Sequence, residues 1–146
     1  MIAIGSDHGG YELKEHIKKH LDELGVEYKD FGTYSEESVD YPDCALPVCK
    51  AVTSGEAEKG ILICGTGIGI SIAANKVKGI RAALCSDVYS ATMAKEHNNA
   101  NVICLGGRVT GRELAFMIVD AWLNAEHLGG RHSNRIEKIH AIENAK

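Results

Sequence analysis

The sequence predicts an α/β fold in which five parallel strands form a sheet between two layers of helices. Short apolar stretches alternate along the 146 residues with segments whose apolar residues recur every three or four positions. Such alternation is typical of strand–helix–strand units joined by right-handed crossovers. One stretch, Ile61 to Cys64, is apolar throughout, as expected for a strand buried on both faces of a parallel sheet. Residues 1–146 amount to one domain, long enough to bury a full core.

The first part of the chain contains two strands around an amphipathic helix. A strand is expected at residues 1–6, and Asp7-His8-Gly9-Gly10 follows at its carboxyl end. The next segment has helical spacing and ends at Gly25, which suits a helix stop; its apolar positions are Leu13, Ile17, Leu21 and Leu24. Residues 26–31 alternate apolar and polar side chains, which favours an outer strand.

The middle of the chain contains a helix, the central strand and a glycine-rich turn. After a polar loop at residues 32–40, Pro42 suits the first turn of a helix that extends to about Ser54. Pro47 should kink this helix. The central strand and its turn come next, and residues 70–74 predict a short helix of small residues packed on the sheet.

The last part of the chain repeats the alternation and ends in two helices. A fourth strand is expected at residues 80–85, then a helix from Ser86-Asp87 to about Glu96, and a fifth strand at residues 102–105. Each of the two final helices is marked by apolar residues on one side: Leu114, Ile118 and Trp122 in the first, and Ile136, Ile139 and Ile142 in the second.

The turn after the central strand has the composition of an anion-binding loop. Gly65, Gly67 and Gly69 carry no Cβ, so the backbone can turn sharply and a ligand can approach its N–H groups. A helix N-terminus behind them adds unpaired donors. Cys64 precedes the turn, and a nearby helix N-terminus favours a thiolate. Cys64 is therefore a candidate nucleophile or base; the alternative is an inert core cysteine.

Several polar loops are expected at the same edge of the sheet as this turn. The carboxyl ends of parallel strands open on one edge, where ligands bind in open α/β sheets. The loops in question are Asp7-His8, Tyr41, Cys64 to Gly69, Ser86-Asp87 and Gly106 to Arg108. Glycine-rich loops are also simply how such sheets turn. The combination of an acid, an imidazole, a thiol and an anion-binding turn favours a catalytic cleft.

Three other functions compete for the same residues. A dinucleotide site would use Asp87 as its ribose-binding acid, but Ile70 occupies the place of the third fingerprint glycine. A metal site from Asp7, His8 and His97 lacks a recognised ligand spacing. A non-enzymatic binding module could use the phosphate-binding turn, although it would have no use for the thiol.

A basic group lies near the end of the chain. Arg131 and Arg135 are four residues apart at the start of the last predicted helix, so both project from one face. Cations near a helix N-terminus oppose the helix dipole, so helix stability alone does not explain them. With His132 between them and Arg108 elsewhere, they are a candidate phosphate-binding cluster; the alternative is a solvated basic face.

Composition argues against several classes of protein. The 16 basic and 20 acidic residues are well mixed and give a formal net charge of −4, so no stripe for nucleic acid or a membrane surface is visible. The five cysteines lack CxxC spacing and three fall in predicted core strands, which favours a reducing cytoplasm over a disulfide framework. No signal peptide or bilayer-spanning apolar run is expected.

Together these motifs resemble ribose-5-phosphate isomerase type B, a family grouped with galactose-6-phosphate and allose-6-phosphate isomerases. The resemblance covers essentially the whole chain, and its motifs occur in the order SDHGG, DYPD, ILICGTGIGISIAANK, HN, GGRV and GGRHSNRI. The CGTGIG and RHxxR motifs are highly specific. Some relatives place a glutamate base a few residues later; this chain keeps Cys64 and has Ala74 and Asn75 there.

The resemblance implies a Rossmann-like sandwich that interconverts ribose 5-phosphate and ribulose 5-phosphate, a reaction of the pentose phosphate pathway, without cofactor or metal. The reaction would pass through a cis-enediolate, with Cys64 moving the proton between C2 and C1. The enediolate oxygens would be held by the backbone of the turn, namely Gly65, Thr66, Gly67, Ile68 and Gly69.

The resemblance also assigns roles to the remaining polar residues. In ring opening, His97 would protonate the ring oxygen, with Thr66 and Asp7 assisting at hydroxyls. One set would hold the phosphate and a pair would line the sugar: His8, Arg108, Arg131 and Arg135, and Tyr41 and Asn98. The family further implies a homodimer, or a tetramer, whose sites draw on both subunits. Our more specific hypothesis is that His97 reaches the Cys64 site of the partner. Allose 6-phosphate and galactose 6-phosphate stay open as substrates, and a dinucleotide-binding module is a more distant alternative.

Overall fold

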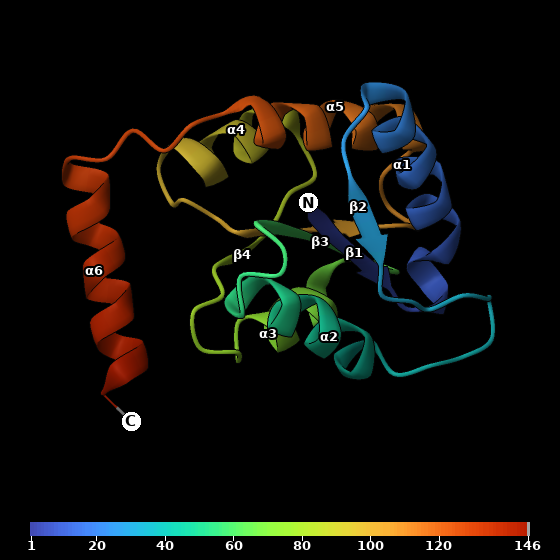
Figure 1. The fold of residues 1–146 in the computed structure, drawn as a ribbon, viewed down its shortest axis with the longest axis horizontal. Coiled ribbons are helices and arrows are strands. Elements are labelled where there is room, and N and C mark those ends of the chain that lie inside the picture. Colours follow the sequence, from blue (N-terminus) through green and yellow to red (C-terminus); the bar gives the residue numbers. More distant parts are fainter. Residues whose placement is uncertain (146) are drawn as a thin grey trace.

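The structure, a computed structural model, describes residues 1–145 and is built on a five-stranded parallel sheet (Figure 1). The strands are β1 (Ile2–Ser6), β2 (Tyr28–Asp30), β3 (Lys59–Cys64), β4 (Ala82–Leu84) and β5 (Val102–Gly106). Their order in the sheet is β2-β1-β3-β5-β4, and every neighbouring pair is parallel. The central place of β3 and the outer place of β2 confirm the prediction from the apolar pattern.

Helices cover both faces of the sheet, which confirms the predicted three-layer sandwich (Figure 1). They are η1 (His8–Gly10), α1 (Tyr11–Leu24), α2 (Tyr41–Thr53), α3 (Ile68–Ala74), α4 (Val88–Glu96), α5 (Arg112–Asn124) and α6 (Arg131–Asn144). One face carries α1, α4 and α5, and the other carries α2 and α3. Helix α2 continues through Pro47, and α3 begins two residues before the expected start.

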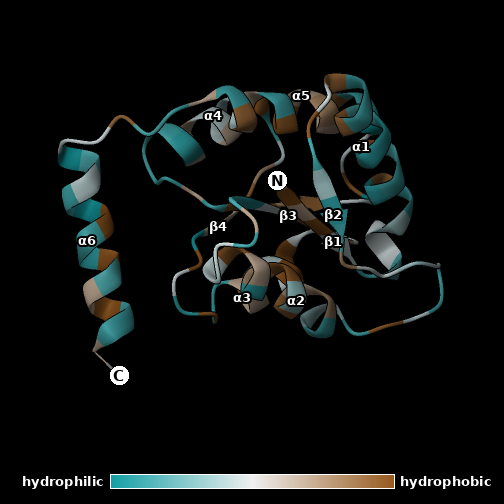
Figure 2. Cartoon of the chain, in the orientation of Figure 1, coloured by the Kyte–Doolittle hydropathy of each residue, from teal (hydrophilic) through white to brown (hydrophobic). Residues whose placement is uncertain are grey.

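The sheet separates two hydrophobic cores because side chains alternate between the faces of a strand. In β3, Ile61 and Ile63 join the core under α1, α4 and α5, whereas Leu62 and Cys64 join the core over α2 and α3. The hydrophobic colouring of β1 and β3 in Figure 2 marks this buried centre. The alternation directs the Cys64 thiol towards the α2–α3 side of the sheet.

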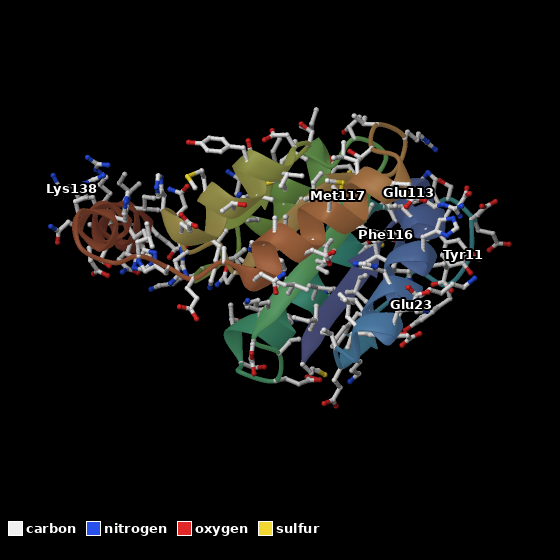
Figure 3. All side chains as sticks on the ribbon, turned by 90° about the horizontal axis from the view of Figure 1, so that it is seen from above. Tyr11, Glu23, Glu113, Phe116, Met117 and Lys138 are labelled. Atoms are coloured by element: carbon white, nitrogen blue, oxygen red, sulfur yellow. The ribbon has the colours of Figure 1, made fainter. Side chains whose placement is uncertain are left out.

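Helix α6 differs from the other helices because it stands beside the sandwich (Figure 1). Seen from above, α6 with Lys138 lies at one end of the molecule and α1 with Tyr11 at the other (Figure 3). Of its three isoleucines only Ile136 is buried, while Ile139 is 47% and Ile142 is 72% exposed. The apolar face of α6 is therefore largely uncovered within one chain.

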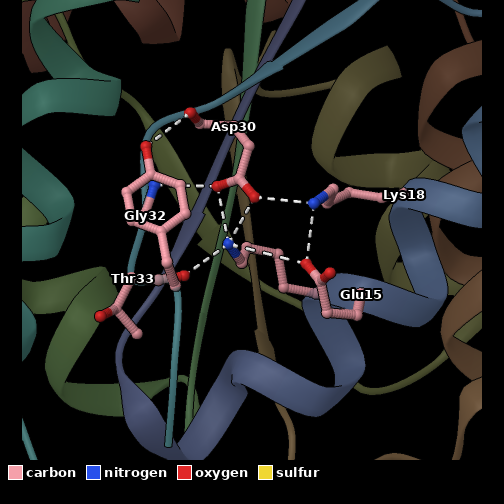
Figure 4. A network of polar contacts seen from close by, with 7 residues as sticks. Glu15, Lys18, Asp30, Gly32 and Thr33 are labelled. Carbon is pink, nitrogen blue, oxygen red and sulfur yellow. Dashed lines mark hydrogen bonds and ion pairs between the residues drawn. The ribbon is translucent and has the colours of Figure 1, made fainter. Parts of the chain in front are cut away.

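A buried lysine anchors the loop that follows β2 (Figure 4). Lys14 is fully buried, and its Nζ donates to both carboxylate oxygens of Asp30 and to the carbonyl oxygen of Thr33, each at 2.6 Å. The same loop pairs with the end of β1, where Thr33 N donates to the carbonyl of Ser6 at 2.7 Å. The network thus fixes the loop directly beside the carboxyl end of β1. Within residues 1–145, no helix is long and apolar enough to cross a membrane.

Candidate active site

The carboxyl ends of β1, β3 and β5 lie side by side and bring three polar loops together. Asp7 N donates to the carbonyl of Ile63 at 3.1 Å, and Gly107 N donates to the carbonyl of Cys64 at 2.8 Å. Arg108 N donates in turn to the carbonyl of Gly65 at 2.9 Å. Backbone hydrogen bonds therefore hold these loops in one arrangement, as the parallel topology predicted.

Cys64 lies at the end of β3 with its sulfur directed at the glycine-rich turn. The residue is 4% exposed, and its Sγ accepts a hydrogen bond from the Gly67 N–H at 3.1 Å. Gly67 has a φ of 80°, and a Cβ there would lie 2.5 Å from the Leu84 side chain. Glycine is thus required both for the backbone conformation and for the space.

The turn presents backbone donors beside the thiol. The Ile68 N–H donates to Thr66 Oγ1 at 3.2 Å. Within residues 1–145, the N–H groups of Thr66 and Gly69 have no acceptor. These donors belong to the turn and the first turn of α3, where backbone N–H groups lack intrahelical partners. They are free to bind an oxyanion next to Cys64.

Arg108 and His8 line a cavity of about 590 Å³ next to this turn. A Cβ on Gly65 would lie 3.3 Å from Arg108 Nη1, and a Cβ on Gly9 would lie 3.4 Å from Arg108 Cζ. The guanidinium group therefore rests against the backbone of both loops. Since a guanidinium and an imidazole face the same cavity, this part of the cleft suits a phosphate group.

His8 is fixed by a backbone contact that the sequence did not predict. Its Nδ1 accepts a hydrogen bond from the Val39 N–H at 3.1 Å. A neutral imidazole that accepts at Nδ1 carries its proton on Nε2, so that nitrogen is left as a donor for a ligand. No residue type signals this contact, because every residue except proline carries a backbone N–H.

Asp7 and Tyr41 also lie at this edge. Asp7 is 6% exposed, and its Oδ1 accepts from the N–H groups of Gly9 at 2.9 Å and Gly10 at 3.1 Å. One oxygen of this carboxylate therefore caps η1. The Tyr41 ring lies against the glycine turn, since a Cβ on Gly69 would be 2.7 Å from its Cζ.

The remaining predicted site residues form a second group at the opposite edge of the sheet. His97 and Asn98 directly follow α4, which runs back from the carboxyl edge, and lie near the beginning of β5. Arg131 and Arg135 lie in the first turns of α6, the helix that stands apart in Figure 1. One chain thus separates the predicted ring-opening acid and two predicted phosphate ligands from Cys64.

The second group contains a buried histidine that was noted in the sequence without a role of its own. The rings of His97 and His132 are stacked, with centroids 4.1 Å apart and planes 11° from parallel. Burial lowers the pKa of His132, and the neighbouring His97, Arg131 and Arg135 lower it further. Among residues 1–145, no three His, Cys, Asp or Glu side chains are placed to hold a metal ion.

Comparison with known proteins agrees with the family resemblance of the sequence motifs. A family model described as Ribose/Galactose Isomerase matches residues 2–139. Ribose-5-phosphate isomerase B of Escherichia coli (strain K12) is 58% identical over 142 residues, which cover 97% of this chain and 95% of that protein.

Solved structures agree with the sequence matches. The structure of Clostridium thermocellum ribose-5-phosphate isomerase B aligns with a TM-score of 0.96 at 60% identity, covering 97% of this chain and 96% of that one. The structure of ribose-5-phosphate isomerase B from Mycoplasma genitalium with bound ribulose 5-phosphate aligns with a TM-score of 0.94 at 44% identity, covering 99% and 97% of the two chains.

Proposed function

The chain belongs to the ribose/galactose isomerase family, and from this premise we propose that it interconverts D-ribose 5-phosphate and D-ribulose 5-phosphate. The observation that carries the proposal is the position of the Cys64 sulfur, 3.1 Å from the Gly67 N–H in a turn where the N–H groups of Thr66 and Gly69 are free. A base beside an oxyanion-binding turn is what an aldose–ketose isomerisation needs.

The chemical step is a proton transfer between two adjacent carbons. A hydrogen on C2 of the open-chain aldose is too weakly acidic to leave unaided, so the site needs a positioned base and stabilisation of the developing enediolate. We assign the base to Cys64, which takes the proton from C2 and returns it to C1. The free N–H groups of Thr66 and Gly69 would bind the enediolate oxygens.

The phosphate end of the substrate would lie against His8 and Arg108. Both face the 590 Å³ cavity, and the Val39 contact leaves His8 Nε2–H as a donor. Charge-assisted hydrogen bonds of this kind are stronger than neutral ones and fix the orientation of the sugar. Tyr41, whose ring lies against Gly69, would line the sugar, and Thr66 and Asp7 would contact its hydroxyls.

The second group of residues requires a partner copy to reach this site. We propose a homodimer in which His97, Asn98, Arg131 and Arg135 of one chain complete the Cys64 site of the other. Two observations support it: the two groups lie at opposite edges of the sheet, and the exposed Ile139 and Ile142 of α6 line a groove of about 620 Å³. In a two-fold dimer such a face and groove are buried reciprocally.

Two further expectations accompany the proposal. We place the enzyme in the reducing cytoplasm, since all five cysteines are free thiols and all are buried. Residues 1–146 would form one sugar-phosphate isomerase domain.

The test is a substrate panel on the purified protein. We expect kcat/KM for ribose 5-phosphate to exceed the values for allose 6-phosphate and galactose 6-phosphate. A preference for either hexose phosphate would move the chain to another member of the same family. Absence of all three activities together with tight binding of a nicotinamide dinucleotide would contradict the isomerase assignment.

A further inference from the structure

The ring of His97 is held by a stacking contact and by no hydrogen bond. His97 directly follows α4 as its C-cap and His132 is the second residue of α6, and their ring centroids are 4.1 Å apart. Among residues 1–145, no hydrogen bond is made to either nitrogen of the His97 ring. The stack therefore fixes the plane of the ring while both nitrogens stay available to other groups.

Hydrogen bonds through His127 and Leu128 connect the backbone segments that carry the two rings. The carbonyl of Glu96, the residue before His97, lies 3.0 Å from His127 Nδ1 and accepts from Leu128 N at 3.0 Å. His127 Nε2 lies 3.1 Å from Ser133 Oγ, next to His132. These contacts connect the end of α4 to the beginning of α6 on either side of the stacked rings.

The charge state of His132 favours a stable stacking contact with His97. Its side chain is 8% exposed, and the groups facing it are His97, Arg131, Arg135 and His127. Burial and these neighbours lower its pKa, so at neutral pH His132 presents an uncharged ring face. A neutral aromatic face can stack on His97 in either protonation state, whereas a second imidazolium would repel it. The contact is therefore compatible with a gain or loss of a proton by His97.

We propose that His132 is a positioning residue for His97, whose ring face orients the His97 imidazole for proton transfer to the ring oxygen of the sugar. The inference rests on the proposed function, and on the ring-opening role that the family resemblance implies for His97. It assigns His132 a function through its ring face, distinct from binding a ligand through its ring nitrogens.

The substrates themselves provide a readout for ring opening. Ribose 5-phosphate exists largely as a furanose and must be opened before its C2 proton can be removed. Ribulose 5-phosphate cannot close a furanose, because its 5-hydroxyl carries the phosphate. Exchange of its C1 hydrogen with solvent deuterium therefore needs Cys64 but no ring step. The ratio of the rate of net ribose 5-phosphate isomerisation to the rate of C1 exchange therefore reports on ring opening, the step assigned to His97.

Two substitutions separate the ring face of His132 from its nitrogens. His132→Phe keeps an aromatic face without nitrogens, and His132→Gln keeps polar groups without a ring. We expect the glutamine variant to lower the ratio by about 10- to 100-fold, since misplacing a general acid has effects of that size, and the phenylalanine variant to stay within about 3-fold of wild type. His140→Ala on the same helix is the matched control and should leave the ratio unchanged. His132→Leu replaces the glutamine variant in the comparison if the latter does not fold.

The outcomes distinguish this inference from the proposal on which it rests. His97→Ala is measured in parallel and should lower the same ratio. If it does and His132→Gln does not, the positioning role is wrong and the role of His97 stands. Equal losses in the phenylalanine and glutamine variants would show that the nitrogens of His132 matter, and would also overturn the inference. An unchanged ratio in His97→Ala would overturn both assignments.

Discussion

The two polar regions of the molecule are built in different ways. The Cys64 region is formed by the ends of adjacent strands, and backbone hydrogen bonds such as Gly107 N to the Cys64 carbonyl hold its loops. The His97 region is formed by the ends of two helices, and side-chain contacts such as the His97–His132 stack hold it. In the proposed mechanism the first region removes a proton from carbon, and the second supplies an acid and two cations. Under that proposal neither region alone would be able to both open and isomerise a sugar phosphate.

Removal of the thiol should have the largest effect. This effect should be on the proton transfer assigned to the first region and not on substrate binding. Cys64→Ala is expected to abolish both isomerisation and C1 exchange, by at least about 10³-fold, while substrate affinity stays close to wild type, because the base acts chiefly in the transition state. Calorimetry and the two kinetic assays measure these quantities.

Cys104→Ala is the matched control for this substitution. Cys104 is fully buried in β5, and burial raises the pKa of its thiol well above the usual value. The variant should lose stability and keep its kcat. Unchanged kcat in Cys64→Ala would remove the thiol from the mechanism.

Removal of a cation from the second region should affect binding more than chemistry. Arg131→Ala or Arg135→Ala is expected to weaken substrate binding by about 1.5–3 kcal/mol, roughly 10- to 150-fold in KM, because a charge-assisted contact to phosphate is lost. Competition by inorganic phosphate should weaken in parallel.

Lys138→Ala, on the same helix (Figure 3), serves as the control for the arginine variants because Lys138 is exposed and is not one of the predicted phosphate ligands. Normal affinity in both arginine variants would leave only a solvated basic face.

A smaller effect is expected on the free energy of unfolding at low pH, and it depends on a network outside the His97 region. Burial alone would raise the pKa of Asp30, but hydrogen bonds from Lys14, Lys18 and the Gly32 N–H lower it below its usual value. A carboxylate whose pKa is lower in the folded state stabilises the fold above its unfolded pKa, and this contribution is lost as pH falls through the folded pKa. We therefore expect the free energy of unfolding to fall between about pH 5 and pH 2, and the fall to be shallower in Asp30→Asn.

The Asp30 network contacts the loop beside β1 and lies away from His97. Glu137→Gln on α6, whose carboxylate is exposed, is the control and should keep the wild-type acid dependence. The same slope in Asp30→Asn and wild type would show that the network in Figure 4 does not contribute to acid sensitivity.

The regions also differ in how far the sequence could predict them. The apolar run of β3 and the glycines after it predicted the position of Cys64, because parallel strands place their carboxyl ends together. His97 and His132 are 35 positions apart, and no periodicity links them, so their stack is visible only in the structure. Lys14 shares the helical spacing of Ile17 and Leu21, which was a signal of its burial, but its partner Asp30 depends on the register of β2.

The measurement that tests the shared site most directly is complementation between two inactive variants. Cys64→Ala and His97→Ala chains are mixed in equal amounts, unfolded, refolded together and assayed with ribose 5-phosphate. Random pairing makes about half of the dimers mixed, and each mixed dimer has one intact site, so activity should recover to about a quarter of wild type. If the two groups act within one chain, mixing restores nothing, and that result with mixed dimers demonstrated by mass spectrometry would contradict the shared site.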